Sequence, residues 1–91
     1  MKTLLLHITG RVQGVFYRAE TKREADLLGL TGWVKNNADG SVTCVAQGRT
    51  DKVNRLTDWC KNGSDASRVD SVESTVVDSD ELFDTFEIRR S

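Results

Sequence analysis

The sequence contains no proline, one histidine and only two cysteines in 91 residues. Two cysteines allow at most one disulfide, and neither they nor the histidine have the spacing of a metal site. No apolar run approaches the ~20 residues that span a bilayer, and Leu4–Leu6 is too short for a secretory signal. We therefore expect a cytoplasmic protein with no membrane partner and no metal.

The chain also lacks a strong charge of either sign, because 13 basic residues face 14 acidic ones. A net charge of −1 gives no global field that would attract nucleic acid, so we expect no nucleic-acid partner. There is no repeat, linker or low-complexity tract. Length and composition fit one globular domain over residues 1–91, which we expect to be a monomer.

Hydrophobic periodicity predicts alternating strands and helices. In chain order they are a strand at Thr3–Thr9, a helix at Arg18–Leu30, a hairpin of Trp33–Lys35 and Ser41–Gln47, a helix at Thr50–Cys60, a strand at Arg68–Asp78 and a last strand region marked by Phe83, Phe86 and Ile88. The order β-α-β-β-α-β with a short C-terminal strand predicts an α+β ferredoxin-like sandwich. In this fold an antiparallel sheet carries both helices on one face.

The same periodicity predicts the core. The expected core residues are Leu4, Leu6 and Ile8 of the first strand, Thr21, Ala25 and Leu28 of the first helix, Val42, Cys44 and Ala46 of the hairpin, and Val53, Leu56 and Cys60 of the second helix. Thr50 or Asp51 is the expected N-cap of the second helix. For Cys44 and Cys60 we favour buried free thiols over a disulfide.

The segment most indicative of function is Gly10–Arg18, which reads GRVQGVFYR and joins the first strand to the first helix. Unpaired N–H groups and the peptide dipoles make such a junction a natural anion site. Gly10 and Gly14 allow close approach of the backbone, and Arg18 supplies a charged planar donor group that matches phosphate oxygens. The segment matches neither a P-loop nor a dinucleotide fingerprint. Taken alone it is also compatible with an ordinary tight turn.

A second informative segment is Gly32–Gly48, which reads GWVKNNADGSVTCVAQG. Its Asp-Gly pair predicts a hairpin turn at Asn37–Gly40. Asn36 closes the first strand of the hairpin with a neutral amide that both donates and accepts hydrogen bonds.

Together, GRVQGVFYR and GWVKNNADGSVTCVAQG resemble the two signature segments of the acylphosphatases, enzymes that hydrolyse the carboxyl–phosphate bond of acyl phosphates. The resemblance implies that Arg18 binds phosphate and that Asn36 positions the attacking water. It also implies a phosphate-binding loop formed by the amides of Gln13, Gly14, Val15, Phe16 and Tyr17, with no cofactor and inorganic phosphate as product. Two positions depart from the family: Tyr17 stands where Phe is more usual, and Ser64 where many members have proline.

The expected partner is therefore a small acyl phosphate, and we expect broad acyl tolerance because every recognised contact is directed at the phosphate. Two alternatives remain open. One is a non-catalytic ferredoxin-like module that binds RNA on its sheet, which the lack of aromatics in Thr3–Thr9 and Ser41–Gln47 disfavours. The other is a domain that acts on carbamoyl phosphate within a larger maturation enzyme, but here we expect a free-standing enzyme.

Three further features receive structural interpretations. His7 is expected to have a structural or surface role, and Trp33 and Trp59 are expected to be core or half-buried residues and not ligand platforms. The acidic stretch Asp78–Asp84 is expected to be a solvated loop, because its carboxylates lack ligand spacing.

Overall fold

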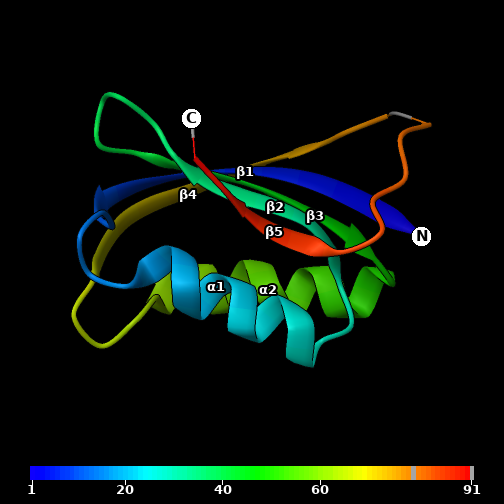
Figure 1. The fold of residues 1–91 in the computed structure, drawn as a ribbon, viewed down its shortest axis with the longest axis horizontal. Coiled ribbons are helices and arrows are strands. Elements are labelled where there is room, and N and C mark those ends of the chain that lie inside the picture. The colour runs from blue at the N-terminus through cyan, green and yellow to red at the C-terminus, as the bar shows by residue number, and fades with distance from the viewer. Residues whose placement is uncertain (79, 91) are drawn as a thin grey trace.

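The computed structural model describes residues 1–78 and 80–90, which form two helices and five strands (Figure 1). The elements are β1 (Lys2–Arg11), α1 (Tyr17–Leu27), β2 (Thr31–Asn36), β3 (Val42–Gly48), α2 (Thr50–Asn62), β4 (Arg68–Val76) and β5 (Phe86–Arg89). The strands form one sheet, and both helices lie side by side on one of its faces. The expected α+β architecture is confirmed.

The strand order is β4-β1-β3-β2-β5. The first four of these are joined by antiparallel pairings, as expected, whereas β5 pairs parallel to β2. The C-terminal strand runs this way because β4 finishes at the end of the sheet where β2 begins. The described residues of the connection, 77, 78 and 80–85, lie at that same end, so a strand that pairs with β2 must follow its direction (Figure 1).

Helix α1 ends at Leu27, earlier than the expected Leu30, because the chain turns at Gly29. Gly29 has a φ of 71°, which favours glycine. The next N–H group, that of Leu30, then donates to the carbonyl oxygen of Ala25 at 2.9 Å. This turn leaves Leu28 only partly buried and places Leu30 in the core in its stead.

Helix α2 begins at Thr50, as expected, and ends at Asn62, two residues beyond the expected Cys60. The expected N-cap at Thr50 or Asp51 is wrong, because both residues lie inside the helix. Arg49 occupies the N-cap position and makes no side-chain capping bond. Asp51 lies in the first turn, where its carboxylate interacts favourably with the helix dipole and pairs with Arg49 Nε at 3.3 Å. At the other end Gly63 follows the helix, as the sequence indicates.

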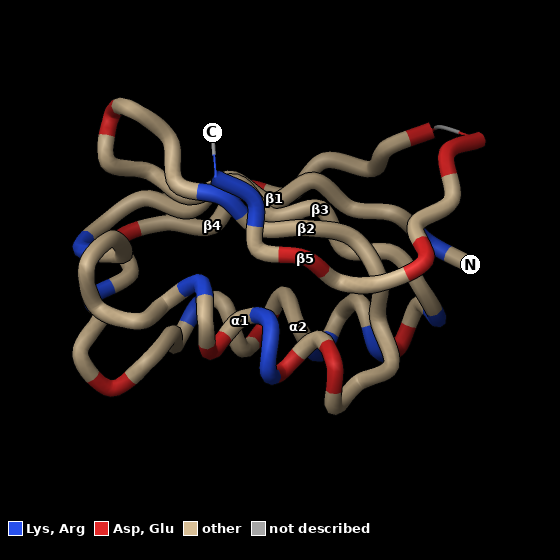
Figure 2. The backbone as a smooth tube through the Cα atoms, viewed as in Figure 1, with Lys and Arg blue, Asp and Glu red and all other residues tan. Residues whose placement is uncertain are grey.

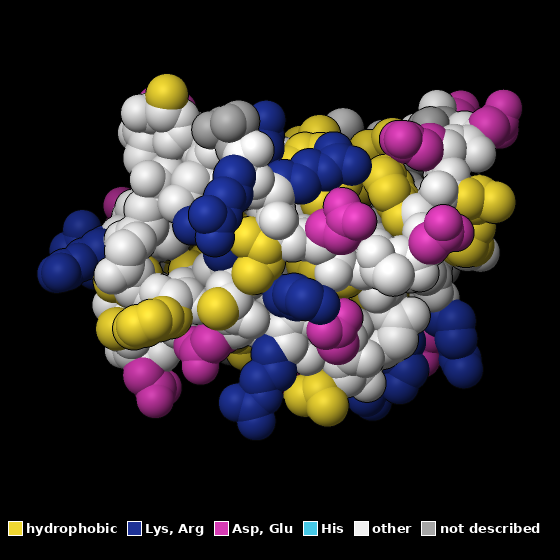
Figure 3. Space-filling view, viewed as in Figure 1, with side chains coloured by type: hydrophobic (Ala, Val, Ile, Leu, Met, Phe, Trp, Pro, Cys, Tyr) yellow, Lys and Arg dark blue, Asp and Glu magenta, His cyan; other side chains and the backbone are white. Residues whose placement is uncertain are grey.

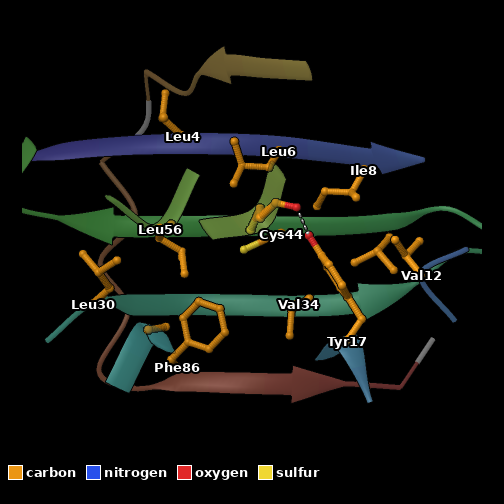
Figure 4. Close-up of a cluster of buried hydrophobic side chains, with 14 of the residues drawn as sticks. Leu4, Leu6, Ile8, Val12, Tyr17, Leu30, Val34, Cys44, Leu56 and Phe86 are labelled. Carbon is orange, nitrogen blue, oxygen red and sulfur yellow. Dashed lines mark hydrogen bonds between the residues drawn. The ribbon is translucent and has the colours of Figure 1, made fainter. Parts of the chain in front are cut away.

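The core lies between the sheet and the helices (Figure 4). With the exception of Leu28, all the residues expected there are buried. Val12, Val15, Tyr17, Leu30, Val34 and Phe86 complete it. Cys44 and Cys60 are both buried free thiols.

Burial of these thiols predicts that the fold loses stability in alkali. Burial raises the pKa of Cys60 from 9.0 to about 12, and it raises the pKa of Cys44 as well. Above pH 9 the unfolded chain releases these protons while the folded chain retains them, so stability falls as pH rises. We expect Cys60 to cost about 1.4 kcal/mol of stability per pH unit between pH 9 and about 12, and Cys44 to steepen this decline. Urea unfolding at pH 8 and pH 10.5 measures it.

The Cys60→Ala variant provides the control for this prediction. Its unfolding free energy at pH 8 is expected to be lower than that of the wild type because a cavity forms. Its unfolding free energy is expected to fall less steeply with pH, because one of the two buried thiols is missing. An identical decline in the wild type and the variant would contradict the assignment.

Candidate active site

The segment between β1 and α1 is fixed to the core by every second or third side chain. Val12, Val15 and Tyr17 are buried, whereas Gly14 and Phe16 are exposed. This pattern anchors the loop by its apolar side chains and leaves the intervening backbone facing solvent. These buried side chains therefore fix the course of the loop, which has no regular hydrogen-bond ladder.

Two residues of this loop adopt left-handed backbone conformations. Gly14 has a φ of 71°, and Phe16, the N-cap of α1, has a φ of 62°. Phe16 makes no side-chain capping bond, so the first N–H groups of α1 receive no acceptor from it. Alternation of left- and right-handed residues turns successive N–H groups toward one point, which is the geometry of an anion nest. The loop expected at Gln13–Tyr17 thus lies at a helix N-terminus.

Gly10 serves a different purpose from the one expected of it. It lies within β1 at an irregularity in the pairing with β4. A Cβ atom there would lie 2.2 Å from the carbonyl oxygen of Arg68. Gly10 therefore permits close contact between two strands, whereas a Cβ at Gly14 would meet nothing within 4 Å. Of the two glycines, only Gly14 lies in Gln13–Tyr17, which we call the anion loop.

Asn36 is the last residue of β2 and shares the helix-facing side of that strand with Val34. Its Oδ1 atom is buried and accepts no hydrogen bond from any described residue. Buried polar atoms almost always have a partner. An unpaired buried acceptor at the end of a core strand is therefore exceptional, and it marks Asn36 as a candidate functional residue.

Gln13 connects the anion loop to the hairpin that carries Asn36. Its Nε2 donates to the carbonyl oxygens of Asn37 and Ser41, both at 2.8 Å. The hairpin is itself closed by Asn37, whose Nδ2 donates to the hydroxyls of Ser41 and Thr43 at 2.9 and 2.7 Å. The sequence indicated only the backbone of Gln13, but its side chain fixes the position of the loop relative to Asn36.

The two departures from the usual family pattern both supply hydroxyl groups that hold the loop. Tyr17 donates its hydroxyl to the carbonyl oxygen of Cys60 at 2.8 Å (Figure 4). Its ring centroid lies 5.7 Å from that of Trp59. Ser64 donates to the carbonyl oxygen of Val15 at 3.0 Å. Both bonds are buried and tie the loop to the end of α2.

These elements surround a pocket of about 330 Å³. It is lined by Val12, Gly14, Phe16, Tyr17, Arg18, Ala19, Asn36, Ile88 and Arg90. The structure therefore brings Arg18 and Asn36 together, as expected. Gln13 and Val15 are absent from the lining and support it from behind.

Arg90 is the functional candidate that sequence reasoning missed. The side chains at Phe86, Ile88 and Arg90 alternate with Glu87 and Arg89, so they face the helices. This places Ile88 and Arg90 beside the start of α1, where both line the pocket. The alternation of side chains in the last strand is the sequence pattern that indicates Ile88 and Arg90 as residues of the helix-facing side.

The positive charge at the pocket comes from Arg18 and Arg90, whereas the exposed Arg11 at the end of β1 does not line it. Basic residues gather at the end of β5 and at the start of α1 (Figure 2). In the space-filling view, Lys and Arg side chains and hydrophobic side chains lie next to one another over the end of β5 (Figure 3). The pocket is thus cationic with apolar walls.

Among the described residues of the pocket, no side chain is suited to donate a proton. Among the described residues that line it there is no Asp, Glu, His or Cys. Tyr17 is the one weak acid, but burial, followed by the proximity of Cys60, raises its pKa. Its hydroxyl is also engaged with the Cys60 carbonyl. Chemistry that needs a general acid is therefore not supported by these side chains.

The remaining candidates lie elsewhere. His7 is half-buried on the open face of β1, and Trp59 is partly buried against the core. Trp33 lies 4.7 Å from the guanidinium of Arg89 on the same open face. The two central strands β1 and β3 carry no aromatic side chain, which disfavours the RNA-binding alternative.

Within the described residues, no group of three or more potential ligands is placed to hold a metal ion. The described part of the acidic stretch 78–84 has neither helix nor strand structure. None of the helices found in residues 1–78 and 80–90 has the length and apolar character needed to cross a membrane.

Comparison with known proteins gives the family of the chain. The Acylphosphatase family model matches residues 4–88. An acylphosphatase of Shewanella amazonensis is 42% identical over 91 residues, which cover 100% of both chains. One of Rhizorhabdus wittichii is 53% identical over 68 residues, which cover 75% of this chain and 69% of the relative.

Solved structures show the same likeness. The acylphosphatase of Bacillus subtilis superposes with a TM-score of 0.94 at 37% identity, covering 98% of this chain and 99% of that one. Full-length HypF in a phosphate- and nucleotide-bound form matches with a TM-score of 0.87 at 25% identity. The match covers 97% of this chain but 12% of HypF.

Proposed function

Because the chain belongs to the acylphosphatase family, we propose that its pocket hydrolyses acyl phosphates by binding the phosphoryl group and directing a water at it. The observation that carries this proposal is the unpaired, buried Oδ1 of Asn36 in the same pocket as Arg18. Arg18 is suited to bind an anion, and Asn36 is suited to orient a nucleophile.

The phosphoryl group is held by the backbone amides of Gln13–Tyr17 and by the Arg18 guanidinium. The amides at the N-terminus of α1 and its dipole favour negative charge. The guanidinium adds planar, permanently charged donors that match phosphate oxygens. These groups also stabilise charge on the equatorial oxygens in the transition state, which is the main requirement of phosphoryl transfer.

Asn36 acts on the water. Its Oδ1 accepts one hydrogen bond from the water and so aims the oxygen lone pair at phosphorus. The water oxygen forms a bond to phosphorus while the bond from phosphorus to the acyl oxygen breaks. The carboxylate leaves with that electron pair, and the proton of the water passes to a phosphate oxygen. An amide is not a base near neutral pH, so its contribution is orientation.

The lack of an acid in the pocket determines which bonds it can break. A carboxylate leaving group has a conjugate acid with a pKa of about 4 to 5, so it departs without a proton. An alkoxide leaving group needs a general acid, which typically contributes ~100- to 10,000-fold. The side chains of this pocket therefore suit acyl phosphates and not alkyl phosphates.

We expect benzoyl phosphate to be hydrolysed with a kcat/KM at least ~1,000-fold above that of ethyl phosphate, within the range that a missing general acid accounts for. We also expect EDTA to leave the rate unchanged, because Arg18 and the helix terminus supply the positive charge. Release of inorganic phosphate from benzoyl phosphate and from ethyl phosphate, each measured with and without EDTA, checks both expectations. Loss of activity in EDTA that Mg²⁺ restores would contradict the second.

The same assay distinguishes the alternatives. Carbamoyl phosphate belongs in the panel, because exclusive hydrolysis of that compound would favour the maturation-enzyme reading over a general acylphosphatase. Binding of single-stranded RNA, measured at one fixed salt concentration, tests the non-catalytic reading. Hydrolysis without RNA binding is the expected result.

A further inference from the structure

The pocket is larger than the group that the proposed function places in it. A phosphoryl group displaces roughly three waters, on the order of 90 Å³ at ~30 Å³ for each water. The pocket measures about 330 Å³. More than half of its volume is therefore left for the organic part of the substrate, and the nature of its walls indicates which acyl groups fit.

One wall of this remaining volume is Phe16. Its side chain is 80% exposed, so its ring contributes nothing to the core. Its backbone nevertheless has a φ of 62°, a left-handed conformation that is unfavourable for a bulky residue. Glycine or asparagine would fit that backbone better. Neither packing nor backbone geometry explains a phenylalanine here. The residue lines this pocket and also a neighbouring hollow beside Ser64 and Asp65.

A second apolar wall comes from the sheet. Ile88 of β5 is 38% exposed and lines the same pocket. It projects from the helix-facing side of β5, near the start of α1, where Phe16 is the N-cap. An aromatic ring on the loop and a branched aliphatic chain on the strand thus bound one cavity from two elements. Such surfaces bind flat apolar groups by burial and stacking.

We propose that Phe16 and Ile88 form an acyl subsite that selects acyl phosphates with a flat apolar body, such as an aromatic ring. This inference rests on the proposed function, because the subsite has meaning only beside a bound phosphoryl group. It also narrows the broad acyl tolerance that the sequence suggested. Binding of the acyl group lowers KM for the preferred substrates and leaves the chemistry at phosphorus to Arg18 and Asn36.

The test compares benzoyl phosphate with acetyl phosphate. The informative variant is Phe16→Asn, because asparagine tolerates the left-handed backbone and removes the apolar ring. The ratio of kcat/KM values for the two substrates cancels any general loss that follows from a disturbed loop. We expect this ratio to fall about three- to tenfold, mainly through KM for benzoyl phosphate, in line with the loss of one aromatic contact.

Three further variants sharpen the test. Phe16→Tyr keeps the ring and is expected to retain the wild-type ratio. Ile88→Ser removes the opposite wall without touching the loop and is expected to lower the ratio two- to fivefold, so the proposal stays testable even if Phe16→Asn does not fold. Leu27→Asn, at an equally exposed apolar residue (72%) at the far end of α1, is the matched control and is expected to leave the ratio unchanged.

Two results would overturn the inference. A ratio within twofold of wild type in both Phe16→Asn and Ile88→Ser would show that these side chains do not contact the acyl group, while the proposed function would stand. Failure of the wild type to hydrolyse either substrate would instead remove the proposed function and, with it, the subsite. The wild-type assay distinguishes the two failures.

Discussion

Replacement of Arg18 by alanine is expected to abolish both phosphate binding and turnover. Arg18 follows the left-handed Phe16 at the start of α1 and lines the pocket with Asn36. Hydrogen bonds from a guanidinium to phosphate oxygens are charge-assisted, and their loss affects the ground state and the transition state alike. We expect kcat/KM for benzoyl phosphate to fall by at least ~1,000-fold, comparable to the loss of an arginine in other phosphoryl-transfer enzymes. Inhibition by inorganic phosphate should disappear with it.

Two variants make this result interpretable. Arg23→Ala removes an exposed arginine from the same helix and from outside the pocket, and it is expected to behave as wild type. Arg18→Lys keeps the charge but loses the planar fork, and it is expected to recover only a small part of the activity. Near-normal inhibition by phosphate in Arg18→Ala would mean that the loop amides bind the anion alone.

Replacement of Asn36 by alanine is expected to separate turnover from binding. The Oδ1 of Asn36 has no partner among the described residues, so its removal breaks no hydrogen bond that holds the fold. Loss of one oriented polar group in an active site typically costs ~100- to 1,000-fold in kcat. We expect a fall of about 100-fold in kcat for benzoyl phosphate, with the inhibition constant of inorganic phosphate within twofold of wild type.

Asn54→Ala provides the matched control for this second experiment. Asn54 is an exposed asparagine on α2 whose side chain accepts a hydrogen bond from Lys2 at 3.2 Å, far from the pocket lining. Its removal is expected to leave kcat unchanged. If Asn36→Ala turned over at the wild-type rate, Asn36 would have no part in the mechanism.

The elements that sequence reasoning predicted well are those that depend on local periodicity. Strand β1, with Leu4, Leu6 and Ile8 facing the helices, is an example, because a period of two follows directly from strand geometry. The end of α1 was predicted too late because the left-handed turn at Gly29 overrides the continuing apolar pattern at Leu28. The parallel direction of β5 depends on where β4 ends, and no local pattern reveals this.

The site divides in a similar way. Arg18 and Asn36 were indicated by residue type and motif, and the fold brings them to one pocket. Arg90 and Ile88 were missed because they are far from both motifs in sequence and reach the pocket only through the pairing of β5 with β2. The side-chain bonds of Gln13 and Ser64 were also missed, since each spans more than 20 residues and depends on tertiary structure.

The bonds from Gln13 to the carbonyl oxygens of Asn37 and Ser41 have a consequence for behaviour on heating. Because they join the anion loop to the hairpin, we expect heating to move the two halves of the site together and to leave their spacing nearly constant. A site of this kind does not need a closing motion before each turnover. Its activity would then persist up to the temperature of cooperative unfolding and vanish with the fold, with no inactive yet folded state in between.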